Sequence, residues 1–311
     1  MSLLVSPRAD RAPAADASAD PVEFGRQPTA RSIGLSDTCF YIAFGVIGST
    51  YVLLILAMLV ADVVYMVDQA LRAAHRSPDF WVAVLANNPI MTALADPKIQ
   101  YSIWLSMISC TLSGIFSVLI AVPLGYLMSR HHFFGRSVID AFLDIPIVLP
   151  PLVVGLSLLI LFQFPPFRWF ARDIVYQVPA VVLAQFSVAC AFAVRTMKST
   201  FDHIDPRCEQ VALSLGCSRL QAFGWVVLPE AGRGMLTAFT LAWARSLGEF
   251  GPLLIFAGAT RMKTEVLSTS VFLEMNVGNL EAAVAVSLIM VFAAVIVLVV
   301  TRLFGSRDLG L

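Results

Sequence analysis

Six long apolar runs constrain this chain more than any other feature of its sequence. They lie at about residues 39–67, 101–128, 139–163, 177–197, 234–258 and 281–303. A transmembrane helix needs about 20 consecutive, mainly apolar residues, and each run meets that length. Only 14% of the residues are charged, whereas about 25% is usual for a soluble domain. The sequence therefore predicts an all-α membrane protein with six transmembrane helices.

The positively charged residues predict how these helices are oriented. Of the lysines and arginines, 13 fall in the connections on the side of the N-terminus and 7 in those on the opposite side. Cytoplasmic loops carry the excess of Lys and Arg in membrane proteins. Both termini are therefore expected in the cytoplasm.

This topology divides the chain into four segments. Residues 1–36 have no apolar period and are rich in Ala, Pro, Asp and Ser, which predicts a disordered cytoplasmic tail. Residues 37–100 are expected to hold the first transmembrane helix and an outside loop, 101–305 the helical core, and 306–311 a cytoplasmic C-terminus. Because the first apolar run begins only near Cys39, it is expected to stay as an anchor rather than to be removed as a signal peptide.

The composition argues against several other functions. A formal net charge of +0 without a basic cluster argues against nucleic acid as a partner. None of the three lysines, Lys98, Lys198 and Lys263, follows a glycine, so the sequence lacks a phosphate-binding loop of the Gly-Lys-Ser or Gly-Lys-Thr type. No apolar run contains a histidine, and the five cysteines show no CxxC spacing. We therefore expect a non-catalytic chain with no metal or cofactor of its own.

The connection at 198–233, expected on the cytoplasmic side, has the pattern of two short helices. Asp205 can cap the first helix, Pro206 suits its first turn, and Gly216 suits the left-handed residue that ends it. Apolar residues recur at helical spacing at Cys208, Val211, Ala212 and Leu215, then at Leu220, Phe223 and Val227. Apolar faces on a loop in contact with the cytosol predict a docking element.

This connection resembles a loop of ABC importer permeases that reads Glu-Ala-Ala, three residues, Gly, nine residues, Ile, any residue, Leu-Pro. At those spacings the chain has Gln210-Val211-Ala212, Gly216, Val226 and Leu228-Pro229. Gln210, Val211 and Val226 replace the family's Glu, Ala and Ile, while Glu209 lies one position early. The resemblance implies that residues 205–229 form a coupling element that seats in a groove of a separate ATPase subunit. The implied coupling residues are Glu209, Gln210, Val211, Ala212, Gly216, Leu228 and Pro229.

The fifth apolar run has features suited to a translocation pathway. Arg245 and Glu249 lie within it at i, i+4 spacing, on one helical face. They could form an ion pair that holds the helices together, or Arg245 could lend positive potential to an anion path. Gly248, Gly251 and Pro252 surround Glu249 and predict a helix that opens there and frees backbone N–H groups for an anion.

The third apolar run is interrupted by Pro146, Pro150 and Pro151. Prolines break the helical hydrogen-bond ladder, and such breaks are tolerated at membrane depth where neighbouring helices or a cavity satisfy the freed groups. A kinked packing helix and a pathway-lining helix both fit this pattern.

The prolines of the third run, the string Arg-Ser-Leu-Gly-Glu-Phe-Gly and the segment 278–288 resemble the molybdate permease branch. Sulfate, thiosulfate and tungstate permeases are close to that branch. The resemblance covers about residues 95–305 and implies import of a tetrahedral oxyanion, although Pro252 stands where the family often has a small residue. A secondary anion transporter is the alternative from another class, but no internal repeat supports it.

The resemblance also implies the rest of the assembly. The fold is expected to be the six-helix type I ABC importer permease fold, with 101–305 as the permease core, in a bacterial plasma (inner) membrane. ATP and Mg²⁺ are expected on the ATPase partner rather than on this chain. The implied partners are two ATPase subunits, a second permease subunit that is most simply identical, and an extracytoplasmic oxyanion-binding protein.

Overall fold

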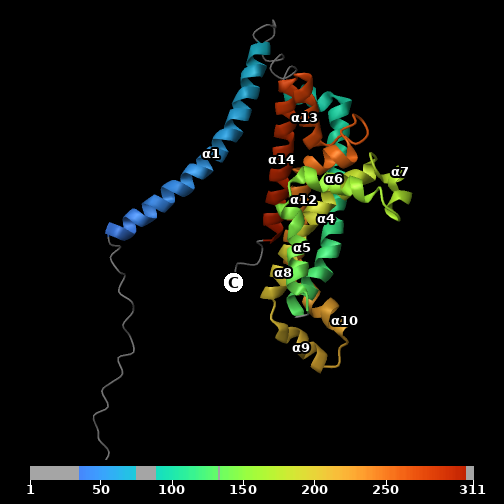
Figure 1. Cartoon of the computed structure of the whole chain (residues 1–311). Helices are drawn as coiled ribbons and strands as arrows, with labels where there is room; N and C mark the ends of the chain where they lie inside the picture. The colour runs from blue at the N-terminus through green and yellow to red at the C-terminus, as the bar shows by residue number, and fades with distance from the viewer. Residues whose placement is uncertain (1–34, 75–88, 132–133, 306–311) are drawn as a thin grey trace, which may run out of the picture. The chain divides into compact units, whose positions relative to one another are not determined.

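The computed structural model describes residues 35–74, 89–131 and 134–305, and every regular element within these ranges is a helix (Figure 1). The chain divides into two compact units, Met1–Ala57 and Met58–Leu311. Helix α1 (Leu35–Ala74) belongs to both units, and the other described helices lie in the second. The predicted C-terminus at 306–311 and almost all of the predicted tail at 1–36 lie outside the described residues.

The second unit contains the whole of the predicted core, residues 101–305. Its first helices are α3 (Pro89–Ala95), α4 (Pro97–Arg130), α5 (Arg136–Val148), α6 (Pro151–Leu161), the 3-10 helix η1 (Phe167–Trp169), α7 (Ala171–Ile174) and α8 (Val178–His203). Between α8 and α12 lie α9 (Pro206–Ser214), α10 (Arg219–Ala222), the π-helix η2 (Phe223–Val227) and α11 (Leu228–Glu230). The last helices are α12 (Gly232–Leu247), the π-helix η3 (Leu253–Ala257), α13 (Leu267–Val277) and α14 (Leu280–Gly305).

Four helices in the described ranges are long and apolar enough to cross a membrane as continuous spans. These stretches are Phe40–Gln69, Pro97–Arg130, Val178–His203 and Leu280–Thr301. They match the first, second, fourth and sixth predicted spans, which are confirmed as helices. The second begins a few residues early because the Asp96 carboxylate caps α4, accepting a hydrogen bond from the Lys98 N–H at 2.9 Å.

The third predicted span, 139–163, is broken rather than straight. Helices α5 and α6 differ in direction by 111° and count together as a fifth candidate span. Pro150 and Pro151 explain the break, because a residue that precedes proline is disfavoured in the helical conformation. Leu149 and Pro150 accordingly have ψ angles of 140° and 132°.

The fifth predicted span, 234–258, is divided as well. Helix α12 has 16 residues and ends at Leu247, and η3 begins at Leu253. Glycine and proline are the residues least compatible with a helix interior. Gly248 lies in the break at 248–250, and Gly251 and Pro252 begin the helical segment that continues as η3. The opening that these residues predict beside Glu249 is therefore present.

Small residues allow α4 to pack closely on its neighbours. Five serines recur along α4 every three or four residues and are all buried, namely Ser102, Ser106, Ser109, Ser113 and Ser117. Further along α4, a Cβ on Gly125 would stand 2.8 Å from the backbone nitrogen of Lys198 on α8. Seams of small and hydroxyl-bearing residues are usual between membrane helices, where they permit close approach and interhelical hydrogen bonds. The apolar runs alone did not reveal this seam.

Candidate functional site

The connection between α8 and α12 folds into short helices at one end of the second unit (Figure 1). Asp205 caps α9 by accepting a hydrogen bond from the Arg207 N–H at 2.9 Å, and Pro206 is the first residue of that helix. Gly216 has a φ of +92°, the left-handed conformation that follows many helix ends. The predicted cap and turn are confirmed.

The apolar side chains of this connection divide between two sides. Ala212, Ala222 and Val227 are buried. Four larger apolar side chains are exposed: Val211 at 58%, Leu215 at 81%, Leu220 at 80% and Trp225 at 73%. We call these four residues the exposed apolar set. Exposed apolar patches mark interaction surfaces, so the set fits the docking element that the sequence predicts.

Glu209 and Gln210 have different surroundings although they are adjacent. One Glu209 carboxylate oxygen accepts a hydrogen bond from the Tyr126 hydroxyl at 2.6 Å, and the other lies 3.9 Å from the Arg130 Nε. Gln210 is exposed. An amide therefore occupies the position of the family's Glu, and the acidic side chain one position earlier contacts α4. Sequence reasoning missed Tyr126 and Arg130, because nothing in the sequence pairs α4 with a loop 83 residues away.

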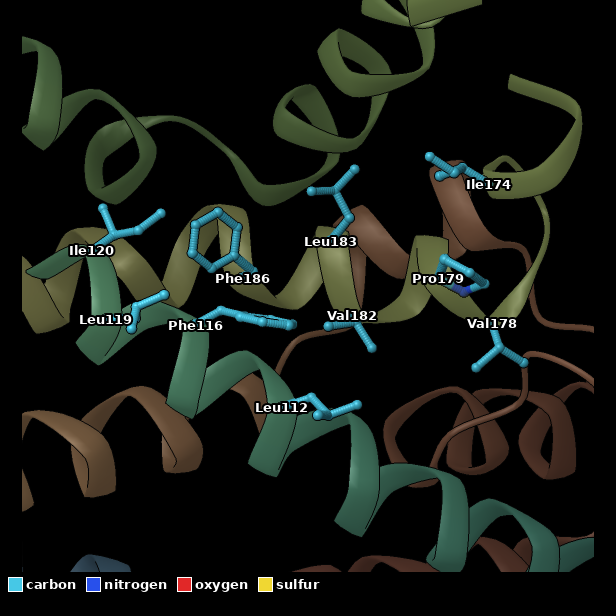
Figure 2. A pocket seen from close by; sticks show the side chains of 10 residues that line it. All are labelled: Leu112, Phe116, Leu119, Ile120, Ile174, Val178, Pro179, Val182, Leu183 and Phe186. Carbon is cyan, nitrogen blue, oxygen red and sulfur yellow. The ribbon is translucent and has the colours of Figure 1, made fainter. Parts of the chain in front are cut away.

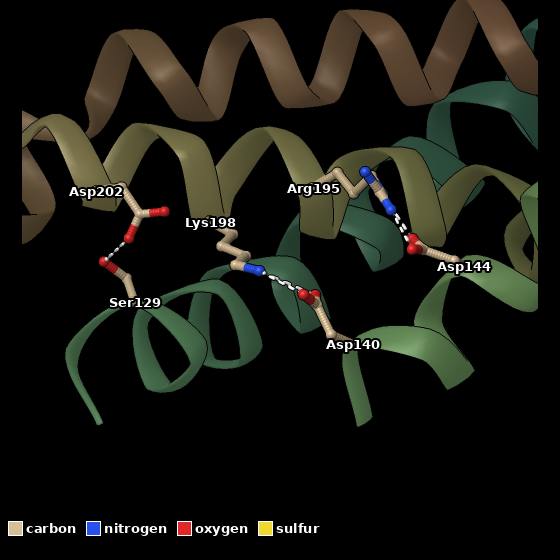
Figure 3. A network of polar contacts seen from close by, with 6 residues as sticks. All are labelled: Ser129, Asp140, Asp144, Arg195, Lys198 and Asp202. Atoms are coloured by element: carbon tan, nitrogen blue, oxygen red, sulfur yellow. Dashed lines mark hydrogen bonds and ion pairs between the residues drawn. The ribbon is translucent and has the colours of Figure 1, made fainter. Parts of the chain in front are cut away.

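A row of polar contacts joins α8 to α4 and α5 near this connection (Figure 3). Its members are Arg195 with Asp144, Lys198 with Asp140 at 2.8 Å, and the Ser129 hydroxyl donating to Asp202 at 2.6 Å. Partly exposed ion pairs of this kind are worth about 0.2–1 kcal/mol each, so the row positions α5 on α8 more than it stabilises the fold. The one-turn spacing of the two aspartates on α5 was the sequence signal that could have revealed it.

The predicted ion pair of the fifth run is present. Arg245 Nη2 lies 2.8 Å from Glu249 Oε1, and the Arg245 guanidinium lies 5.5 Å from the centroid of the Phe192 ring. The Glu249 side chain is 1% exposed, whereas that of Arg245 is 35% exposed. The pair thus combines a buried carboxylate with an accessible cation, an arrangement compatible with both the packing and the pathway interpretations.

The two helix breaks lie against each other. A Cβ on Gly251 would stand 2.8 Å from the Pro151 Cβ, and one on Gly155 would stand 2.8 Å from the Pro252 Cα. Both distances are shorter than van der Waals contact, so glycine at these positions permits the approach. The structure therefore brings together Pro151 and Gly251, two of the predicted pathway residues.

The other predicted pathway residues are less constrained. Pro146 is half-buried within α5, while Pro150 and Gly248 are exposed. The N–H groups of Gly248 and Glu249 donate to the carbonyls of Ala244 and Ser246, each at 3.3 Å. The prediction of N–H groups freed for an anion is wrong for these two residues, because the Gly248 N–H continues the i→i−4 pattern of α12 and the Glu249 N–H makes an i→i−3 bond at its end.

Two grooves of the second unit differ in chemistry. One, of about 580 Å³, runs between α4 and α8 and is lined by apolar side chains such as Phe116 and Phe186 (Figure 2). The other, of about 680 Å³, is lined by α8 and the start of α12, with Arg195, Thr200 and Arg233 among its residues. The apolar groove has no charged group for an anion, whereas the polar groove has cationic and hydroxyl groups together with the carboxylate of Glu230.

These helices, their small-residue packing and the exposed loop define a multi-pass membrane protein of the transport-permease class. The chain belongs to the family of binding-protein-dependent transport system inner membrane components, whose family model matches residues 121–307. That match covers α8, α12 and the whole connection between them.

Several relatives of known description are similar over most of their length. The sulfate transport system permease protein CysT of Escherichia coli is 30% identical over 226 residues, which cover 70% of this chain and 82% of the relative. A probable molybdenum ABC transporter permease protein of Haloferax volcanii is 34% identical over 233 residues, covering 75% and 82%. The molybdate/tungstate transport system permease protein WtpB of Thermococcus kodakarensis is 31% identical over 218 residues, covering 70% and 83%.

Solved structures agree on the fold. A chain of a bacterial ABC transporter involved in the import of the acidic polysaccharide alginate superposes with a TM-score of 0.58 at 17% identity, covering 82% of this chain and 96% of that chain. The predicted all-α fold of a type I ABC importer permease is confirmed.

Proposed function

We propose that this chain is the translocation subunit of an ATP-driven importer that moves a tetrahedral oxyanion into the cell. The names of its relatives support this proposal, because they describe sulfate, molybdenum and molybdate/tungstate permeases. Molybdate is the first candidate substrate, and sulfate, thiosulfate and tungstate are the alternatives. The observation that carries the proposal is the exposed apolar set on a loop with the importer spacing.

The coupling role rests on how this loop is built. Capped at Asp205 and turned at Gly216, α9 presents Val211 and Leu215 to the outside of the molecule. A partner that covers these side chains removes apolar area from water, which contributes about 25 cal/mol per Å². We assign ATP and Mg²⁺ to that partner, an ABC ATPase, and keep this chain as the non-catalytic subunit.

The pathway role rests on Arg245 and on the polar groove. A partly exposed guanidinium beside a buried carboxylate supplies a local positive potential whose net charge stays small, so an anion is attracted without being held tightly. Tight capture then belongs to an extracytoplasmic binding protein. Near the loop, the polar groove contains the Thr200 hydroxyl and the partly exposed guanidinium of Arg195, which is paired with Asp144, beside the carboxylate of Glu230. These donors can contact an anion that leaves the pathway without holding it tightly.

The proposed subunit stoichiometry follows if each coupling loop docks on one ATPase subunit. We propose two copies of this chain with two ATPase subunits in a bacterial inner membrane, with both termini of each copy in the cytoplasm. A different second permease would be revealed by a heteromeric complex after purification of the tagged chain.

Copurification with the cognate ABC ATPase tests the docking assignment. Gly216→Val forces a β-branched residue into a positive-φ position, which costs about 1–2 kcal/mol and misplaces α9 relative to α10. We expect reduced ATPase copurification and reduced uptake. Gly232→Val is the matched control, because no atom lies within 4 Å of its Cβ position and no positive φ is recorded there. Full assembly and transport by Gly216→Val would show that the loop is not the docking element.

Uptake in a strain that lacks the chain ranks the substrates. Labelled molybdate, sulfate and tungstate are supplied separately, and ATP-dependent accumulation identifies the preferred anion. Transport that persists without any ATPase would favour a secondary anion transporter. Accumulation of a sugar or a cationic peptide instead would end the oxyanion assignment.

A further inference from the structure

Tyr126 is the point at which helix α4 meets the connection that carries the exposed apolar set. It lies near the end of α4, with its ring centroid 5.7 Å from that of Phe201 on α8 and 4.7 Å from that of Phe223 on η2, both in edge-on geometry. Its hydroxyl donates to Glu209 on α9 at 2.6 Å. One side chain of α4 therefore contacts three other elements, two of which belong to the loop.

Arg130 reinforces this contact one turn further along α4. Its Nη2 donates to the carbonyl oxygen of Ile204 at 2.8 Å, and its Nε lies 3.9 Å from Glu209. The side chains of Arg130 and Glu209 are only 10% and 14% exposed. A charge-assisted hydrogen bond that is shielded from water is stronger and more directional than an exposed one. Both carboxylate oxygens of Glu209 thus face α4.

Helix α4 is not adjacent to this loop along the chain. The loop continues directly from α8 and into α12, whereas α4 is separated from α8 by α5, α6, η1 and α7. A displacement of α9 therefore pulls α8 and α12 through the backbone, and it reaches α4 through the packing of α4 on α8 and through the contacts of Tyr126 and Arg130 with the loop. Because α9 has nine residues and is bounded by the turn at Gly216, it can tilt as a small rigid piece.

We propose that Tyr126 and Glu209 form a latch that makes α4 follow the coupling loop when the partner ATPase displaces it. The proposal rests on the coupling function proposed above and assigns Tyr126 as a positioning residue for transport. Without the latch, ATP hydrolysis continues because the exposed apolar set still binds the ATPase, but the end of α4 at Tyr126 follows the loop less closely and the pathway opens less often. The latch also explains why the acidic side chain points inward while Gln210 faces out.

The test compares transport with ATP hydrolysis in the reconstituted importer. Tyr126→Phe keeps the ring on Phe201 and Phe223 and removes the hydroxyl alone. In proteoliposomes that contain the full complex, we expect uptake of labelled molybdate or sulfate per ATP hydrolysed to fall by about fivefold, in the range of typical coupling effects. ATPase copurification and basal hydrolysis should stay as in the wild-type complex. A contact that served folding alone would not change this ratio.

Ser129→Ala is the matched control. Ser129 lies on the same helix end and loses a hydrogen bond of the same length, 2.6 Å, but its partner is Asp202 on α8 rather than the loop. We expect an unchanged ratio for Ser129→Ala. Because the readout is uptake per ATP hydrolysed, a lower yield of the Tyr126→Phe complex does not change the comparison.

Three results would overturn the latch. They are an unchanged ratio in Tyr126→Phe, loss of ATPase binding in Tyr126→Phe, or an equal fall of the ratio in Ser129→Ala. Failure of the proposed function looks different, because the wild-type complex would then show no ATP-dependent anion uptake at all.

Discussion

At the residue scale, the glycines of this molecule differ in how strictly the surrounding structure requires them. Gly251 and Gly155 allow the broken spans to touch, and Gly216 permits the turn of the loop. Gly248 lies in the same broken segment as Gly251, yet the nearest atom to a Cβ there would be 3.8 Å away. Residues that look alike in the sequence therefore differ in what they tolerate.

Replacing Gly251 and Gly248 by alanine should show that close packing requires a glycine at the first position and not at the second. Gly251→Ala places a Cβ 2.8 Å from Pro151 and 2.9 Å from the Leu152 nitrogen, so backbone must shift. We expect a loss of about 1–3 kcal/mol, the usual cost of overpacking, seen as a lower thermal unfolding midpoint in detergent. Gly248→Ala is the control and should unfold as the wild type does. Equal destabilisation by the two variants would contradict the interlocked breaks.

Comparing protein stability with anion transport should show whether the Arg245–Glu249 pair serves helix packing or the anion pathway. Arg245→Gln leaves a 1%-exposed carboxylate without its partner, and breaking a buried pair in this way costs about 3–5 kcal/mol, reduced here because Arg245 is partly exposed. Adding Glu249→Gln removes the stranded charge and should restore the unfolding midpoint. We expect anion uptake to stay low in the double variant, because the positive potential is gone. Recovery of both stability and uptake would show that the pair only stabilises helix packing.

At the element scale, the loop is divided into a buried face, which packs on the bundle, and an exposed apolar face. Ala212, Ala222 and Val227 are buried, while Leu215 and Leu220 stand about four-fifths exposed. Burial holds the short helices in place, since nine- and four-residue helices have little stability of their own. The outward side chains are then free to serve recognition rather than folding.

Leu215→Ser should therefore affect binding and not stability. The side chain is 81% exposed, and surface substitutions usually change the free energy of unfolding by no more than about 0.5 kcal/mol. We expect an unchanged unfolding midpoint together with weaker ATPase copurification. Met262→Ser, an exposed apolar residue of the 259–266 loop, is the control and should bind as the wild type does. A variant that binds fully would exclude Leu215 from the interface.

At the scale of the whole molecule, the second unit combines tight helix packing with two interrupted spans. Ser113 of α4 shares a hydrogen bond of 2.9 Å with Ser246 of α12, and the backbone of α8 lies against Gly125. Helices α4, α8 and α12 thus behave as a packed group, whereas α6 meets η3 across the broken segments. Interrupted spans beside closely packed continuous helices are a recurrent arrangement in membrane transport proteins.

Much of this architecture could be predicted because lipid imposes simple rules on sequence. Four predicted spans are continuous helices, and the breaks at Pro150–Pro151 and around Gly251 fall where proline and glycine interrupt the other two. The cap at Asp205 and the turn at Gly216 follow from local backbone chemistry, which neighbouring residues decide. The i, i+4 contact of Arg245 and Glu249 is equally local.

Contacts between distant segments were decided by the tertiary structure. Tyr126 meets Glu209 across 83 residues, and Asp144 meets Arg195 across 51. No local pattern encodes those separations, because they depend on how helices rotate and approach once small residues let them pack. The sequence by itself determined where the chain enters lipid, breaks and turns, since those depend on hydrophobicity and backbone propensity. Which side chains then connect the loop to the bundle was settled by helix packing, because pairing across a fold depends on the relative placement of whole elements.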